Sequence, residues 1–208
     1  MKTYNLYNMI SRFYDKAVSS PFLRRVRSQE KDTLSQILKE HILPSDIVLE
    51  IGAGTGDYTI LLVEISRKIT AVEFSSGMMK QLRNKISRTD RICFEKKDAR
   101  KIKSFDGFDI IVGIGIAEHI NLFKVLSVFQ GSNARLAVFT IPTKTYSGRC
   151  MRLFYNLFGV PCRLYEKKEI YSKLSIYKEL DVRIYDINDR KYCKPHTKVV
   201  VIKRQPGN

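Results

Sequence analysis

The sequence of 208 residues contains no apolar run that approaches the roughly 18–20 residues needed to cross a membrane. Its first residues, MKTYNLYNMISRFYDK, also lack the continuous apolar segment of a secretory signal peptide. These absences argue against an integral membrane protein and against a secreted one. We therefore expect a cytoplasmic protein.

Cysteine is scarce: the four residues are widely spaced and form no C-x-x-C pair. This spacing matches no zinc-site pattern, so free thiols and no bound metal are expected. Internal repeats, low-complexity tracts and linkers rich in proline, glycine or serine are absent as well. A chain of this length without linkers is predicted to form one domain with a sizeable core.

Acidic residues are few: Asp and Glu number 21 against 37 Lys and Arg, which gives a formal net charge of +16. Residues 144–204 contain 15 basic and 6 acidic residues, so more than half of the excess lies in the C-terminal third. Such a surface attracts anions: nucleic acid, anionic lipid headgroups or acidic small molecules. A solvated basic face explains the same count, so the charge alone selects no partner.

Short apolar runs alternate with helical patterns from residue 46 onward. The segments TGDYTILLVEIS, SSGMMKQLRNKIS and AEHINLFKVLSVFQ have helical periodicity. Runs of strand length, rich in Val, Ile and Phe, precede, separate and follow these segments, at residues 46–52, 68–74, 91–95, 108–116 and 134–142. This alternation predicts βαβ units, a parallel sheet and helices on both of its faces.

Two further apolar runs, residues 181–187 and 196–204, are joined by a short polar loop, which predicts an antiparallel pair. Ahead of the sheet, residues 22–43 have the apolar face of a helix. The predicted fold class is therefore α/β: a Rossmann-like, seven-stranded, mostly parallel sheet with an antiparallel C-terminal hairpin.

Three glycines, Gly52, Gly54 and Gly56, follow the first apolar run in VLEIGAGTGDYT. A dinucleotide-binding loop, G-x-G-x-x-G, would have its third glycine where this chain has Asp57, whose charge repels phosphate. No G-K-[ST] follows, which excludes a Walker loop. A cationic ligand without phosphate is therefore expected. S-adenosylmethionine (SAM), with its sulfonium and ammonium groups, fits.

Four segments in this order resemble the motifs of class I SAM-dependent methyltransferases, in the branch that acts on small molecules: VLEIGAGTG, KITAVEFSSGMM, FEKKDARKI and FDIIVGIGIAEHI. The resemblance implies that Glu50 anchors the loop near the methionine end and that Glu73 accepts the ribose hydroxyls. It places Phe74 beside the adenine, with Met78 or Met79. The full set implied for the cofactor is Glu50, Gly52, Ala53, Gly54, Gly56, Tyr58, Glu73, Phe74, Met78, Asp98, Ala99, Gly115 and Ile116.

The resemblance also implies how the single domain is divided. Residues 1–45 form a helical lid, 46–142 the SAM-binding core, 143–180 a helical substrate-binding insertion and 181–204 the closing strand pair.

Methyl transfer from a sulfonium depends on alignment, and a general base is needed only when the nucleophile is protonated. His119 follows the fourth strand at the carboxyl edge of the sheet and is the candidate base. Tyr7 and Tyr14 lie in an aromatic N-terminal segment that resembles a cofactor cover. Arg149 and Arg152 lie in a basic, apolar stretch that suits a substrate with an acidic group.

These observations favour a SAM-dependent methyltransferase that acts on a small acidic or hydrophobic molecule. An RNA methyltransferase is the alternative, because ribosomal-RNA dimethyltransferases have a motif similar to VLEIGAGTG. The proline-containing motif that holds a base amine is missing after the fourth strand, which disfavours nucleic acid. A non-catalytic SAM-binding fold is the third hypothesis, and the sequence also leaves room for peripheral lipid contact.

Overall fold

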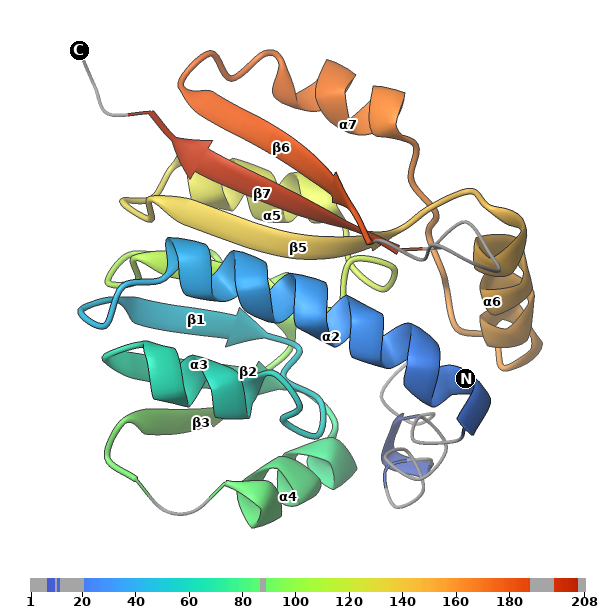
Figure 1. Cartoon of the computed structure of the whole chain (residues 1–208), viewed down its shortest axis with the longest axis horizontal. Helices are drawn as coiled ribbons and strands as arrows, with labels where there is room; N and C mark the ends of the chain where they lie inside the picture. Colours follow the sequence, from blue (N-terminus) through green and yellow to red (C-terminus); the bar gives the residue numbers. More distant parts are fainter. Residues whose placement is uncertain (1–6, 10, 12–20, 87–88, 188–196, 206–208) are drawn as a thin grey trace.

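The computed structural model describes residues 7–9, 11, 21–86, 89–187 and 197–205. Its centre is a seven-stranded sheet with the order β3-β2-β1-β4-β5-β7-β6 (Figure 1). The first five strands are parallel, and β7 runs antiparallel to both β5 and β6. The strands are β1 Ile47–Ile51, β2 Lys68–Glu73, β3 Ile92–Lys96, β4 Ile110–Gly113, β5 Leu136–Pro142, β6 Leu180–Asp186 and β7 Thr197–Arg204. The predicted fold class is confirmed.

Helices cover both faces of this sheet, as Figure 1 shows with α2 and α3 in front and α5 behind. Side chains alternate along each strand, so Val48 packs with α2 and α3 while Leu49 packs with α5 and α7. The helices are α2 Pro21–His41, α3 Thr59–Ile65, α4 Ser76–Lys85, α5 Leu122–Gln130, α6 Tyr146–Leu157 and α7 Lys167–Leu174, with a 3-10 turn η1 at Ala99–Lys101. None of the helices in the described ranges is long and apolar enough to cross a membrane.

The segment after β4 differs from the prediction. A helix was expected from Ala117, and a strand up to residue 116, but β4 ends at Gly113 and α5 begins at Leu122. The carbonyl of Ala117 accepts a hydrogen bond from the Tyr165 hydroxyl at 2.9 Å. The carbonyl of Glu118 accepts one from the Arg163 amide at 3.0 Å. These carbonyls are thus used in a tertiary contact, and the segment forms turns at the carboxyl edge of the sheet.

Candidate cofactor and substrate site

The glycine loop after β1 has a left-handed backbone at all three glycines, with φ of 74° at Gly52, 59° at Gly54 and 91° at Gly56. Their surroundings differ. A Cβ on Gly56 would lie 2.5 Å from Cδ1 of Leu82, so this glycine lets α4 pack against the loop. A Cβ on Gly54 would meet nothing within 4 Å. Gly54 is therefore the position where the loop presents bare backbone to open space.

Glu73, at the end of β2, joins this loop to the next turn. Its Oε2 accepts from the Gly54 amide at 3.0 Å, and its Oε1 accepts from the Ser75 amide at 2.7 Å. Burial raises the pKa of this carboxyl, and the backbone hydrogen bonds oppose that shift. The acid predicted to bind the ribose thus also fixes the loop that the cofactor must approach.

Glu50 is almost completely buried in β1, where its Oε2 accepts from the Thr59 hydroxyl at 2.6 Å. Burial raises the pKa of Glu50 to about 8, with the Thr59 hydrogen bond acting in the opposite direction. The carboxyl is thus mostly uncharged at neutral pH in the free chain. Sequence reasoning selected Glu50 but missed Thr59, nine residues away on the first turn of α3.

The loop after β4 meets the glycine loop. The Gly115 amide donates to the Thr140 hydroxyl at 2.7 Å, and Ile116 packs on Gly52, where a Cβ would lie 3.0 Å from its side chain. Ala53 is also buried, but it packs with Ala71 of β2 and with α4. Three predicted cofactor residues from two motifs are therefore brought together.

The predicted adenine side is partly committed to other contacts. Phe74 is 37% exposed, whereas Met78 is buried. Tyr58, which was predicted among the cofactor residues, packs in the core with α2, α3 and the sheet. Asp98 caps η1 just before Ala99 and forms an ion pair with Arg100 at 2.8 Å, and the hydrogen bond from Arg100 lowers the pKa of the Asp98 carboxyl. The adenine contact of Asp98 remains a prediction.

His119 lies in the turns after β4 and has a partner on each ring nitrogen. Nδ1 is 3.0 Å from the carbonyl oxygen of Pro161, and Nε2 is 3.0 Å from the Tyr7 hydroxyl. Burial lowers the pKa of His119, so the ring is neutral at neutral pH. A carbonyl only accepts, which puts the proton on Nδ1 and makes Nε2 the acceptor for Tyr7. Tyr7 in turn accepts from the Tyr155 hydroxyl at 2.9 Å, because its own proton is donated to His119.

The N-terminal segment contacts two sides of the site through neighbouring residues. Tyr7 reaches His119 and α6, while Oδ1 of Asn8 accepts from the Ser75 hydroxyl at 2.6 Å and from the Gly77 amide at 3.0 Å. This segment therefore connects the start of α4 with the turns after β4. Tyr14, the other predicted cover residue, lies outside the described residues.

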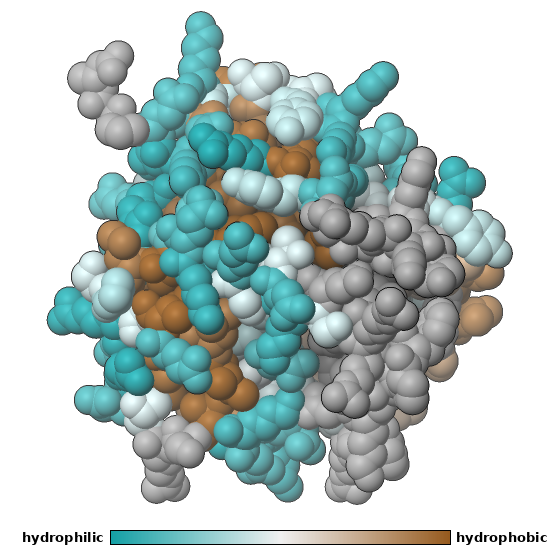
Figure 2. Space-filling view, viewed as in Figure 1, coloured by the Kyte–Doolittle hydropathy of each residue, from teal (hydrophilic) through white to brown (hydrophobic). Residues whose placement is uncertain are grey.

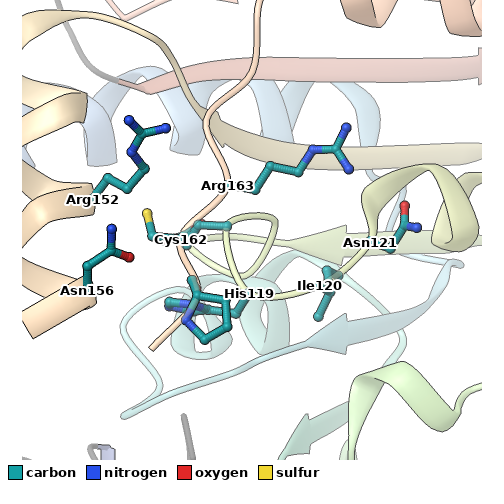
Figure 3. Close-up of a pocket in the computed structure, with 9 residues that line it drawn as sticks. His119, Ile120, Asn121, Arg152, Asn156, Cys162 and Arg163 are labelled. Atoms are coloured by element: carbon teal, nitrogen blue, oxygen red, sulfur yellow. The ribbon is translucent and has the colours of Figure 1, made fainter. Parts of the chain in front are cut away.

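A cavity of about 480 Å³ lies beside His119, between the turns after β4 and α6 (Figure 3). Arg152 and Asn156 project toward it from α6, and Cys162 lies between them and Arg163. Its lining is Glu118, His119, Ile120, Asn121, Arg152, Asn156, Pro161, Cys162 and Arg163. Burial raises the pKa of Glu118 to about 7, which weakens its repulsion of an anion.

The two arginines that line this cavity differ in their contacts with other side chains. Arg163 forms an ion pair with Glu169 at 2.6 Å and stacks over Tyr165. Arg152 is exposed and has no ion pair within the part of the chain that the structure describes. Arg149, the other arginine predicted to bind the substrate, lies on the exposed side of α6 and does not line the cavity.

A parallel sheet closed by an antiparallel hairpin, with a glycine loop after β1 and an acid ending β2, defines the class I SAM-dependent methyltransferase fold. The sequence model of the family described as "Methyltransferase domain" matches residues 48–137, which include all four motifs. Residues 48–137 of this chain are thus a SAM-dependent methyltransferase domain of class I.

Known proteins similar to this chain fall into two groups. By sequence, it is 32% identical over 138 residues to a mitochondrial ribosomal RNA small subunit methyltransferase of Arabidopsis thaliana, and the match covers 62% of this chain but 36% of that protein. The chain therefore spans only about a third of this relative.

By structure, it is similar to a DhpI–SAH complex, with a TM-score of 0.72, 14% identity and coverage of 98% and 96% of the two chains. It is also similar to magnesium protoporphyrin IX methyltransferase of Synechocystis PCC 6803 with bound SAH, with a TM-score of 0.67, 17% identity and coverage of 87% and 85%. At these identities the likeness shows the fold alone.

Proposed function

We propose that this chain transfers the methyl group of SAM to a small molecule that carries an acidic group and an apolar body. The observation that carries the proposal is the cavity beside His119, which has the size of a small-molecule site and an arginine, Arg152, at its wall. A guanidinium binds carboxylate or phosphate groups through paired hydrogen bonds.

Glu50, Gly54 and Glu73 are the residues that would hold SAM, because they combine buried acids with bare backbone at the carboxyl edge of the sheet. SAM, when bound, supplies an electrophilic methyl group on a sulfonium. The chain then has to orient the acceptor and exclude water. Tyr7 and Asn8 span the site and would contribute to that exclusion.

The hydrogen-bond chain Tyr155–Tyr7–His119 offers a route for a proton when the acceptor is protonated. Tyr7 donates to Nε2 of neutral His119, so a proton taken up by Tyr7 is matched by one released to the imidazole. The Pro161 carbonyl keeps the remaining ring N–H oriented. His119 thus acts through Tyr7 in this proposal.

RNA remains the second candidate substrate, favoured by the similarity to the Arabidopsis ribosomal RNA methyltransferase and by the net charge of +16. The absence of the proline motif after β4 bears on the chemistry and disfavours it. A non-catalytic SAM-binding role is the third candidate. It is disfavoured by the ordered motifs and by the contacts around His119.

The test is methyl transfer from labelled SAM into cell extract that is afterwards separated into RNA, protein and low-mass fractions. The proposal expects label in the low-mass fraction. On a substrate isolated from that fraction, Arg152→Gln should raise KM at least tenfold, while Arg149→Gln on the same helix should stay within about threefold. Label recovered in RNA, or equal effects of the two variants, would contradict the proposed site.

A further inference from the structure

The outward face of α6 is an apolar stripe exposed to solvent. Tyr146 is 84% exposed, Leu153 64% and Leu157 77%, and Cys150 between them is exposed as well. Their spacing of three to four residues places all four on one side of the helix. The other exposed large apolar residues described in the chain, such as Leu43 and Ile60 and those near residues 171–176, are scattered over separate elements.

Another side of α6 faces the N-terminal segment and the cavity. Tyr155 bonds to Tyr7, and Arg152 and Asn156 line the cavity. Figure 1 places α6 at the edge of the molecule, and Figure 2 shows apolar side chains at that same edge. The helix therefore stands between the candidate substrate cavity and the solvent, and its stripe contributes nothing to the core.

The charge on α6 itself is positive, because Arg149 and Arg152 are exposed and the helix contains no acidic residue. The other two basic residues of 143–165, Lys144 and Arg163, form ion pairs with Glu166 and Glu169. A helix with an apolar stripe and a cationic margin matches the pattern of helices that lie in the plane of a membrane interface. An RNA partner would use the arginines but would leave the leucines in water, so the stripe favours lipid.

We propose that α6 docks this protein on an anionic lipid surface, with Tyr146, Leu153 and Leu157 in the interface and Arg149 at the headgroups. One part of the inference rests on the proposed function: a substrate with an apolar body would enter the cavity from the bilayer side. Its acidic group would then meet Arg152, which lies on the cavity side of the same helix. The docking surface itself does not depend on the reaction.

The test uses the full chain and sucrose-loaded vesicles, of phosphatidylcholine alone or with about one third phosphatidylglycerol, recovered by sedimentation. The parent should bind the anionic vesicles, bind the neutral ones far more weakly, and lose binding at high salt. Leu153→Gln/Leu157→Gln should lower partitioning at least tenfold, because burial of one leucine alone contributes roughly that factor. Ile176→Gln, which changes a similarly exposed apolar residue on a turn after α7, should bind like the parent.

Calorimetric titration with SAM shows whether the variants are folded, and both should bind it like the parent. The docking proposal fails if the parent ignores anionic vesicles, if the double variant partitions normally, or if the control loses as much. It also fails if the parent is a dimer that the double variant dissociates, because the stripe would then lie between two copies. A parent that binds vesicles but transfers no methyl group would overturn the proposed function and leave the docking surface standing.

Discussion

At the scale of single residues, Gly54 and Gly107 form a matched pair for testing the cofactor loop. Both have a left-handed backbone, with φ of 59° and 84°, and a Cβ on either would meet nothing within 4 Å. Alanine should therefore cost each a similar strain of roughly 1–2 kcal/mol. Only Gly54 lies in the loop after β1, so Gly54→Ala should weaken SAM binding at least tenfold in calorimetry, and Gly107→Ala should leave it within twofold. Equal losses would mean that strain, and not occlusion, is responsible.

Glu50 should make SAM binding release a proton. Its pKa is raised by burial to about 8, so the free chain holds this proton at pH 7, while a cationic ligand nearby favours the ionised form. SAM affinity should therefore rise with pH up to about 8. Titration in two buffers of different ionisation enthalpy measures the release, and Glu50→Gln should abolish it. An unchanged release in Glu50→Gln would assign the proton to another group.

The same carboxyl affects folding with the opposite dependence on pH. Because the pKa is raised from 4.5 in the unfolded chain to about 8 in the folded one, the folded state holds a proton that the unfolded state has lost. The contribution of Glu50 to stability is thus fully present below pH 4.5 and is lost as the pH rises through 8.

His119 and Tyr7 should control the acid limb of the activity. Burial lowers the pKa of His119 from 6.5, so the rate should fall only below pH 6.5, where the ring becomes protonated. Tyr7→Phe removes the hydroxyl that relays the proton, so the rate should fall at every pH. It also removes the donor that stabilises the neutral ring, which should raise the pKa of His119 and move the remaining acid limb to higher pH. Tyr155→Phe is the control, because it keeps the bond between Tyr7 and His119. Identical pH profiles in all three proteins would exclude the proton route.

Local sequence predicts the residues expected to bind the cofactor better than it predicts the contacts on the substrate side. Glu50, Gly54 and Glu73 stand at strand ends in short, recognisable segments, so their neighbourhood could be predicted. The contact of Tyr7 with His119 joins positions 112 residues apart, and that of Tyr7 with Tyr155 joins positions 148 apart. Neither pair leaves a periodic signal, and only the fold reveals them.

At the scale of elements, the sheet was predictable because its central strands, β1, β2, β4 and β5, are buried apolar runs separated by helical patterns. The beginning of α5 was not predictable, because donors from a later part of the chain, the Tyr165 hydroxyl and the Arg163 amide, bond to the carbonyls of Ala117 and Glu118. The helix starts instead where the Asn121 side chain accepts from the Lys124 amide. The sequence also identified a basic, apolar stretch around Arg149 and Arg152, but could not show that part of the apolar surface of α6 faces solvent.

Arg204, on β7, should stabilise the end of α5. Its guanidinium donates to the carbonyls of Phe129, Gln130 and Ser132 at 2.8–3.1 Å, which places a cation at a helix C-terminus. Arg204→Met should lower the free energy of unfolding by about 2 kcal/mol in denaturant titration, since hydrogen bonds to charged groups contribute roughly 1.5–3 kcal/mol. The neighbouring Lys203→Met should change it by less than about 0.5 kcal/mol. If the two variants lose equally, the capping contacts contribute little.

At the scale of the whole molecule, charge and cavity point to different kinds of partner. The net charge of +16 raises the local concentration of any anion, whether polymer or small molecule. The cavity of about 480 Å³ admits a small molecule and has one arginine, Arg152, without an ion pair among the described residues. The affinity of the basic surface for a polyanion and the identity of the methylated molecule can be measured separately. Only the affinity for a polyanion should depend steeply on the salt concentration.

The last prediction uses that separation. An RNA substrate that engages several of the C-terminal cations would lose orders of magnitude in affinity between about 50 and 200 mM salt, because each phosphate contact releases counterions. A small acid that meets Arg152 alone would lose far less. We expect weak retention on RNA across this range, and activity on the low-mass substrate that changes only a few-fold.

Tight, steeply salt-dependent RNA binding with methyl label in the RNA would overturn the small-molecule proposal. Equally steep binding without label in RNA would leave the small-molecule proposal intact. Such binding reports the attraction between the basic surface and phosphate. Methyl transfer to a base would also require a motif that holds its amine, and the proline motif with that role is missing after β4.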